Sequence, residues 1–320
     1  MDPTVEASLI GAVAAIVGIG GTVIVAIAGA RNTRRTNQAT IDAAHADAQL
    51  TLETTREAQF SDRYSRALEQ VGSDNLDVRI GGIYALEGIA IDSPKYHPTV
   101  MEVLTAFIRE HSRKPAADTK VERWPPPDVQ TALTVVNRRN KGRDIRSLNL
   151  SGADLSTAQL DKTDLKGARL VGADLQRTNF NSANLQGADL AGADLIYANL
   201  NSANLIDANL GSTNLRGAYL CGAILSGANL RGAYLCGADL SGAFFGGTDL
   251  SGADLGNANL NGTKLVADFS GADLTDVDIT NADPADADLS GARWRKRTAT
   301  PPGWKVDDNG RLSRHTGRNS

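Results

Sequence analysis

The stretch SGADLSTAQLDKTDLKGARLVGADL, residues 151–175, carries leucine at every fifth position: Leu155, Leu160, Leu165, Leu170 and Leu175. On an α-helix, five residues advance the side chain by about 140°, so these leucines would share no common face. On a flat strand, an odd spacing would send successive leucines to opposite faces. The spacing therefore predicts a chain that runs extended for three residues and bends at the next two, so that every leucine points inward.

The pattern continues through about half of the chain. Its central positions run from Ile145 to Leu265 in steps of five, then step by four to Phe269, and end at Trp294. Leucine fills 24 of these 31 centres, and alanine stands two residues before 23 of them, so both are expected to be buried. Asp or Asn stands directly before 23 centres and is expected to face water. Glycine and serine are frequent at the bends, where glycine tolerates unusual dihedral angles.

The unit Ala183-Asn184-Leu185-Gln186-Gly187 matches the A(D/N)LXX consensus of the pentapeptide repeat family, which the chain resembles over residues 143–294. The resemblance implies a mainly β fold, a right-handed quadrilateral β-helix of about eight coils. Pro284 stands at a centre and has no N–H to donate, so the last units are expected either to be irregular or to form a closing cap. The segment Asp77–Glu87 additionally resembles membrane-anchored, helix-containing bacterial members of the family.

An uncharged apolar run covers residues 8–30, and residues 1–7 form a short tail before it. A helix needs about 20 such residues to span a bilayer, so the run predicts a transmembrane helix. Arg31, Arg34 and Arg35 follow it, which predicts a single-pass protein of the cell membrane with the remainder in the cytoplasm. A cleaved signal peptide within residues 1–30 stays open as the alternative, although acidic Asp2 and Glu6 precede the run.

The remaining segments flank the repeat. Residues 31–71 are polar, contain neither Gly nor Pro, and predict a helical stalk or linker. Residues 72–142 predict a small α-helical region with apolar faces over 77–90, 99–111 and 128–139. Residues 295–320 predict a C-terminal cap and a basic tail, with Trp294 and Trp304 covering the last coil.

The sequence offers no catalytic constellation. It contains no nucleophile with a histidine partner, no metal-ligand spacing around His97 or His111, and no phosphate-binding loop in a suitable context. We therefore expect no enzyme activity, no cofactor and no bound metal. Cys221 and Cys236 are fifteen residues apart, which is three sides of the predicted coil, so they are not expected to form a disulfide.

Four outward positions are apolar or aromatic where Asp or Asn is the rule, and they form the candidate interaction surface: Tyr219, Ile224, Tyr234 and Phe244. Ile224 and Phe244 are twenty residues apart, so they are expected to be neighbours on one face. Two interpretations stay open for these residues. They form a partner or homodimer patch, or they are scattered surface apolar residues of the ordinary kind.

These features predict a non-enzymatic, membrane-tethered scaffold for protein–protein interaction on the cytoplasmic face, with an unknown protein partner. The alternative comes from the resemblance: some soluble members of the family are acidic dimeric rods that mimic DNA and occupy its site on a type II topoisomerase. The net charge of −8 over residues 143–294 is consistent with such mimicry. Direct binding of nucleic acid is not expected.

Overall fold

The computed structural model describes residues 3–113, 125–279, 281–295, 300–301 and 303–314, with side chains described from residue 37 onward. The chain divides into two compact units, Met1–Arg63 and Tyr64–Ser320. Helix α1 (Pro3–Val71) is uninterrupted for 69 residues, of which those up to Arg63 belong to the first unit and those from Tyr64 to the second. The side chains of residues 37–59 are all exposed.

Among the residues that the structure describes, no helix has the length and apolar character needed to cross a membrane. This finding contradicts the transmembrane helix predicted over residues 8–30, and the predicted membrane location is contradicted with it. Residues 8–30 are part of α1, which continues to Val71 because neither Gly nor Pro interrupts residues 32–71. The side chains of residues 3–36 lie outside the description.

The second unit opens with a bundle of short helices, α2 (Leu76–Asp92), α3 (His97–His111) and α4 (Pro127–Arg138), which pack against one another. Their apolar faces bury Leu86, Leu104 and Leu133, as the spacing predicts. Gly82 of α2 has a packing role. A Cβ at Gly82 would lie 2.7 Å from the backbone nitrogen of Val71, so only glycine lets α2 approach the end of α1 this closely.

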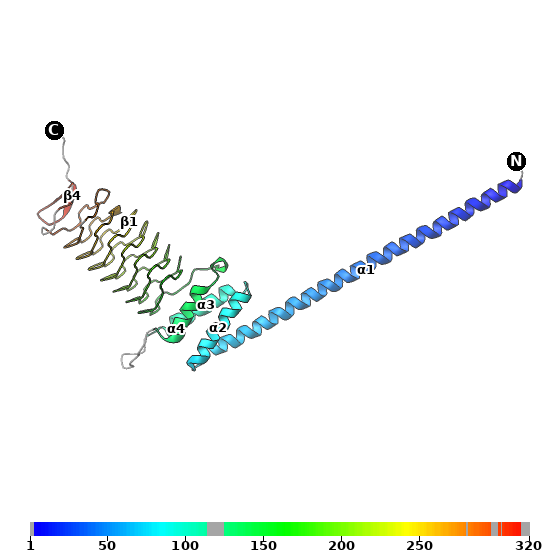
Figure 1. Cartoon of the computed structure of the whole chain (residues 1–320), viewed down its shortest axis with the longest axis horizontal. Coiled ribbons are helices and arrows are strands. Elements are labelled where there is room, and N and C mark those ends of the chain that lie inside the picture. Colours follow the sequence, from blue (N-terminus) through cyan, green and yellow to red (C-terminus); the bar gives the residue numbers. More distant parts are fainter. Residues whose placement is uncertain (1–2, 114–124, 280, 296–299, 302, 315–320) are drawn as a thin grey trace, which may run out of the picture. The chain divides into compact units, whose positions relative to one another are not determined.

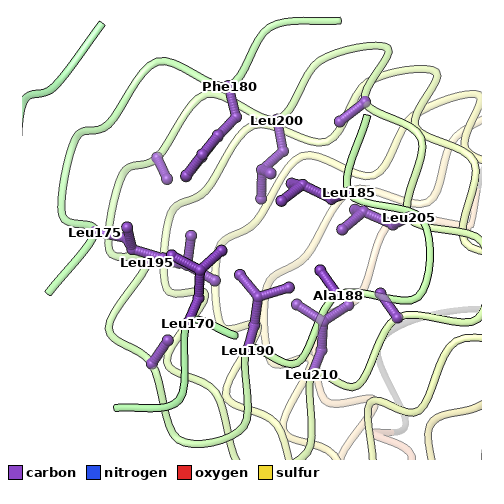
Figure 2. Close-up of a cluster of buried hydrophobic side chains, with 14 of the residues drawn as sticks. Leu170, Leu175, Phe180, Leu185, Ala188, Leu190, Leu195, Leu200, Leu205 and Leu210 are labelled. Atoms are coloured by element: carbon purple, nitrogen blue, oxygen red, sulfur yellow. The ribbon is translucent and has the colours of Figure 1, made fainter. Parts of the chain in front are cut away.

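The repeat region is a stack of four-sided coils (Figure 1). Parallel bridges join residues twenty apart, such as Asn184 and Asn204, and four pentads make one coil. The backbone N–H of Leu185 donates to Asn204 O (2.7 Å), and Asn204 N–H donates to Ala183 O (2.9 Å). Figure 2 shows the consequence inside the coil, where Leu175 lies beside Leu195 and Phe180 beside Leu200. Burial of each leucine side chain stabilises the folded state by about 1.5–3 kcal/mol.

Each corner of a coil is a tight turn. Ala188 N–H donates to Leu185 O (3.0 Å), and Gly187, the second of the two residues between them, has a φ of 63°. This left-handed conformation suits glycine, which explains the Gly of the repeat. Residues with a Cβ occupy the same position in other corners, among them Ser202, Arg177 and Tyr197. The corners therefore bear backbone strain wherever the side chain there is larger than glycine.

Two irregularities near the C-terminal end leave the stack intact. Strand β1 (Thr248–Asp249) pairs in parallel with β2 (Ala267–Asp268), nineteen residues on, so the four-residue step to Phe269 shortens one corner. Pro284 lies on the last full coil. In the ladder, the N–H of each centre residue donates to the next coil, and the ladder has no further coil after the one that holds Pro284. A proline, which lacks the N–H, therefore leaves no hydrogen bond unmade there.

The first predicted centre, Ile145, is not part of the core. Its side chain is 79% exposed, and the ladder begins at Asn149 with Leu150 as the first buried centre. The preceding residues are held by the helices instead. η1 (Lys141–Arg143) leads into Asp144, whose carboxylate accepts from Arg139 Nε (2.7 Å) and lies 3.0 Å from His97 Nε2. These contacts prevent Ile145 from turning inward.

The helical bundle caps the N-terminal edge of the solenoid on all four sides. Ser112 Oγ accepts from Asp154 N–H (3.1 Å), and Arg109 donates to Asn149 O. The side-chain amide of Gln130 pairs with both backbone groups of Gln159. At Asp164, Asn137 Oδ1 accepts from the N–H (3.2 Å), and Arg139 Nη1 donates to the carbonyl (3.0 Å). Side chains thus replace the missing preceding coil.

A hairpin caps the opposite edge. Strands β3 (Trp304–Val306) and β4 (Leu312–Arg314) pair antiparallel. The carbonyl of Gly310 accepts from Trp294 N–H (2.6 Å), and Leu312 exchanges backbone hydrogen bonds with Gly291 and Ala292. Trp294 and Trp304 are buried, as predicted for a terminal cover. Of the basic tail, Lys296, Arg297 and Arg318 lie outside the described residues, whereas Arg295 pairs with Asp276 (2.7 Å).

The fold class is therefore a four-sided β-helix that follows a long helix and a helical cap, without the predicted transmembrane helix.

The cap predicts that substitutions of two neighbouring arginines change the free energy of unfolding by very different amounts. Arg139→Met removes a nearly buried guanidinium that bonds Asp144 and the first coil, and should lower the free energy of unfolding by about 2–4 kcal/mol. Arg138→Met removes a half-exposed partner of Glu87 and should cost about 0–1 kcal/mol. Urea unfolding of the full chain measures both. Equal losses would show that Arg139 does not hold the cap to the coil.

The first coil also predicts a pH-dependent contribution. Burial raises the pKa of Asp164, but hydrogen bonds from Lys141 and from Lys166 N–H lower it by more, so the pKa lies below its ordinary 3.8. The stabilisation is therefore present above pH 3.8 and is lost as the pH falls through the lower pKa of the folded state. Lys141→Gln should destabilise the chain at neutral pH and lose its effect in acid. The exposed Lys162→Gln should show no such trend, and an equal trend there would contradict the assignment.

Candidate protein-interaction surfaces

The outward residues form four columns, one on each face of the coil stack. Face A consists of Asn149, Arg169, Asp189, Asn209, Asn229, Asp249, Asp268 and Asp288; face B of Asp154, Asp174, Asp194, Asn214, Tyr234, Asp254, Asp273 and Arg293; face C of Gln159, Asn179, Asn199, Tyr219, Asp239, Asn259 and Asp278; and face D of Asp164, Asn184, Asn204, Ile224, Phe244, Lys264 and Asp283.

The Asp and Asn side chains of these columns have a structural role. Asn184 Oδ1 accepts from Gln186 N–H two residues on (3.3 Å), which fixes the start of the corner. It also accepts from Asn204 Nδ2 of the next coil (3.3 Å), which forms an amide ladder along the rod. Similar ladder bonds join Asn179 to Asn199 and Asn209 to Asn229. A residue that departs from Asp or Asn therefore gives up hydrogen bonds.

The structure separates the four predicted surface residues into two groups. Ile224 and Phe244 pair on face D, in adjacent coils, as their spacing predicts. Tyr219 lies on face C and Tyr234 on face B, so the tyrosines do not join the Ile224–Phe244 pair on its face. All four side chains are exposed, and Phe244 is the most exposed at 61%.

The tyrosines belong to a cluster around the corner between faces B and C, which we name the tyrosine–arginine patch: Arg177, Tyr197, Arg216, Tyr219 and Tyr234. The Arg216 guanidinium lies 4.8 Å from the centre of the Tyr234 ring, and that of Arg177 lies 6.0 Å from the Tyr197 ring. Both pairs have cation–π geometry. The five side chains are exposed on successive coils.

Tyr197 was not predicted from the sequence. It stands at a corner, two residues after a centre, with a φ of 55°, and its side chain is 53% exposed. Its ring lies over Gly217, the equivalent corner of the next coil, so that a Cβ there would collide with the ring. The signal for Tyr197 was an aromatic residue at a position usually held by Gly or Ser.

Tyr234 leaves a polar atom unsatisfied. In the ladder, an Asn at this position would donate to Asn214 in the coil before it. With Tyr234 there, Asn214 Oδ1 is buried and has no hydrogen-bond partner among the described residues. A buried unpaired acceptor costs about 1–3 kcal/mol. Tyr234 of the patch thus lowers the stability of the coil stack.

The second cluster, the face-D patch, consists of Ile224, Phe244 and Val266. Val266 stands at the corner after face D and is exposed. The amide ladder of this face stops at Asn204, and Lys264 follows Phe244. Face D is the least acidic face. It has two carboxylates, Asp164 and Asp283, and that of Asp164 is paired with Lys141 (2.7 Å).

The described residues hold no candidate metal site. They include no cluster of three His, Cys, Asp or Glu side chains placed to bind a metal. A cavity of about 580 Å³ lies between α3 and residues 144–149, but its acidic groups are already paired, Glu102 with Arg146 and Asp144 with Arg139. Cys221 and Cys236 are both unpaired.

Comparison with protein-family models identifies the repeat. The model described as Pentapeptide repeats matches in eight copies, over residues 144–177, 173–211, 203–242, 213–252, 228–265 and 267–293. The chain belongs to the pentapeptide repeat family. The closer resemblance to membrane-anchored bacterial members is not among the findings, and a comparison with curated proteins found no match.

Solved structures of other pentapeptide repeat proteins are similar to this chain. HetL, a protein involved in heterocyst differentiation regulation from the cyanobacterium Nostoc sp. strain PCC 7120, is 30% identical, with 48% of this chain and 87% of HetL covered and a TM-score of 0.33. AT2G44920 from the Arabidopsis thaliana thylakoid lumen is 27% identical over 42% and 69%, with a TM-score of 0.18.

QnrB1, a plasmid-mediated fluoroquinolone resistance protein, is 23% identical, with 46% of this chain and 80% of QnrB1 covered and a TM-score of 0.23. Each of these TM-scores lies below 0.5, so the likenesses assign no function to this pentapeptide repeat protein.

The packing of Tyr197 predicts unequal effects at two glycines of one corner column. Gly217→Ala adds strain at φ +62° and drives a Cβ into the Tyr197 ring, so it should lower the free energy of unfolding by about 2–3 kcal/mol. Gly237→Ala, one coil on, meets only the strain and should cost about 1 kcal/mol. Urea unfolding measures both. Adding Tyr197→Ser to Gly217→Ala should recover the difference, and no recovery would contradict the packing.

Proposed function

We propose that this pentapeptide repeat protein is a non-enzymatic binding protein whose tyrosine–arginine patch recognises a protein partner. Members of the family are in general structural or interaction proteins without enzyme activity. The observation that carries the proposal is the cluster of three exposed tyrosines and two arginines on a rigid stack of coils.

The composition of the patch supports protein recognition. Tyrosine and arginine are enriched at the energetic centres of protein interfaces, because a tyrosine ring buries a large area with few rotatable bonds. The arginines extend the patch with guanidinium groups that donate to carboxylate or carbonyl oxygens. The partner we expect therefore presents an apolar surface with carboxylates at its border.

The cost at Tyr234 gives a second reason. Asparagine at this position would complete the ladder and satisfy Asn214 Oδ1, whereas tyrosine leaves that atom buried and unpaired. Residues that lower stability are expected at functional sites, where stability and activity are in conflict. The tyrosine at position 234 is therefore better explained by a role in binding than by a role in stabilising the fold.

Mimicry of DNA toward a type II topoisomerase has less support. It requires a continuous acidic surface, and the carboxylates of faces A and B are its candidates. Face B is interrupted by Tyr234 with Arg216 beside its ring, and face A by Arg169. The arginines of the patch would repel a protein surface that binds phosphates.

The proposal separates binding from stability. Tyr219→Asn with Tyr234→Asn restores the ladder residue, so the variant should be as stable as the wild type or more stable. It should bind the partner at least about tenfold more weakly, because tyrosine side chains of this kind contribute about 1–2 kcal/mol or more each. Partners captured on the full wild-type chain would be purified, and the Kd measured for each variant.

Ile224→Asn with Phe244→Asn is the matched control, because it makes the same kind of change on face D and should leave the Kd unchanged. Equal Kd values for the wild type and the tyrosine variant would reject the patch as the binding site.

A further inference from the structure

Face D offers a second surface that the tyrosine–arginine patch does not use. The side chains of Ile224 and Phe244 stand on adjacent coils, with Val266 at the neighbouring corner. We propose that two copies of this chain associate antiparallel through face D, with the two-fold axis between Ile224 and Phe244. This inference is independent of the partner proposed above.

Charge favours a second copy on this face over faces A and B. The repeat region has a net charge of −8, so two copies repel each other through most of their surface. Faces A and B would bring columns of carboxylates together. Between residues 201 and 266, by contrast, face D and its two corners contain only two charged residues, Asp207 and Lys264.

Shape favours close approach. The corners directly beside the Ile224–Phe244 pair carry small residues: Cys221, Gly222, Ser241 and Gly242 on one side, and Ser226, Gly227, Gly246 and Gly247 on the other. The larger corner residues Ile206, Asp207 and Val266 stand one coil away, although the Asp207 carboxylate lies over Gly227. A second flat face can therefore reach both side chains of the pair. Packed sheets lie about 10 Å apart, which two interdigitating apolar side chains fill.

The antiparallel orientation follows from the polar residues at the two ends of the pair. With the axis between Ile224 and Phe244, each Ile224 faces the other copy's Phe244, and each Asn204 faces the other copy's Lys264. Asn204 Oδ1 accepts from Ile206 N–H (3.1 Å), but Ile224 cannot supply the next ladder amide, so one acceptor position stays open on that oxygen. The Lys264 ammonium would fill it. A parallel pair would instead oppose two lysines.

The oligomeric state of the full chain tests the proposal. Sedimentation equilibrium at about 100 μM should show a dimer, since a contact of micromolar Kd is saturated there. Ile224→Asn with Phe244→Asn extends the amide ladder, so it should keep the circular dichroism spectrum and raise the dimer Kd more than about 100-fold. Tyr219→Asn with Tyr234→Asn should stay dimeric. A monomeric wild type, or a dimer that survives the face-D substitutions, overturns the proposal and leaves the face to another protein.

A crosslinking arm tests the register. In a Cys221→Ser, Cys236→Ser background, Asn204→Cys combined with Lys264→Cys should give covalent dimers with a bismaleimide that spans about 10 Å. Each substitution alone should not, because equivalent residues would be offset by three coils, about 14 Å along the rod. Dimers from either single variant would indicate a parallel pair, and no dimers from the double variant would exclude this register. Either result overturns the antiparallel arrangement.

Discussion

The hydrogen bonds between coils are the constraint on which this structure depends. Each extended triplet is too short to be a stable strand by itself. Apart from the hydrogen bond that closes each corner, its backbone groups pair with the coils before and after it. Leucine and alanine fill the interior at the same positions in every coil, so the ladder and the core repeat with one period. Wherever the ladder ends, backbone groups are left over, and both ends of the stack show how the chain satisfies them.

The two caps use different solutions to this common problem. At the N-terminal end, side chains from helices bond to one coil on all four sides, so the helical bundle is part of the solenoid's stability. At the C-terminal end, a hairpin pairs antiparallel with the last triplet and covers it with Trp304. Both caps keep the ladder from pairing with another chain end to end, which leaves the lateral faces for binding.

The repeat could be predicted from the sequence because its information is local. Five-residue spacing determines which residues are inside, and twenty-residue spacing determined that Ile224 and Phe244 would be neighbours. Ile145 fits the pattern but is outside the core, because its neighbour Asp144 is held by His97 and Arg139, which are distant in sequence. Tyr197 was missed for a related reason. Its exposure depends on the glycine twenty residues on. The transmembrane prediction was wrong because it relied on the apolar composition of residues 8–30. That composition does not show that the same helix continues to Val71.

The coil with the shortened corner between Leu265 and Phe269 is complete after nineteen residues, where the others need twenty. The face on which a residue lies therefore depends on the number of corners before it and not on the number of residues. Loss of a single residue at a bend is therefore tolerated, whereas insertion of one whole pentad would rotate everything after it by a quarter turn. Tyr234 would move to the face of Tyr219, and Phe244 would leave Ile224. A rod of this kind can lengthen during evolution only by complete turns if it is to keep its surfaces aligned.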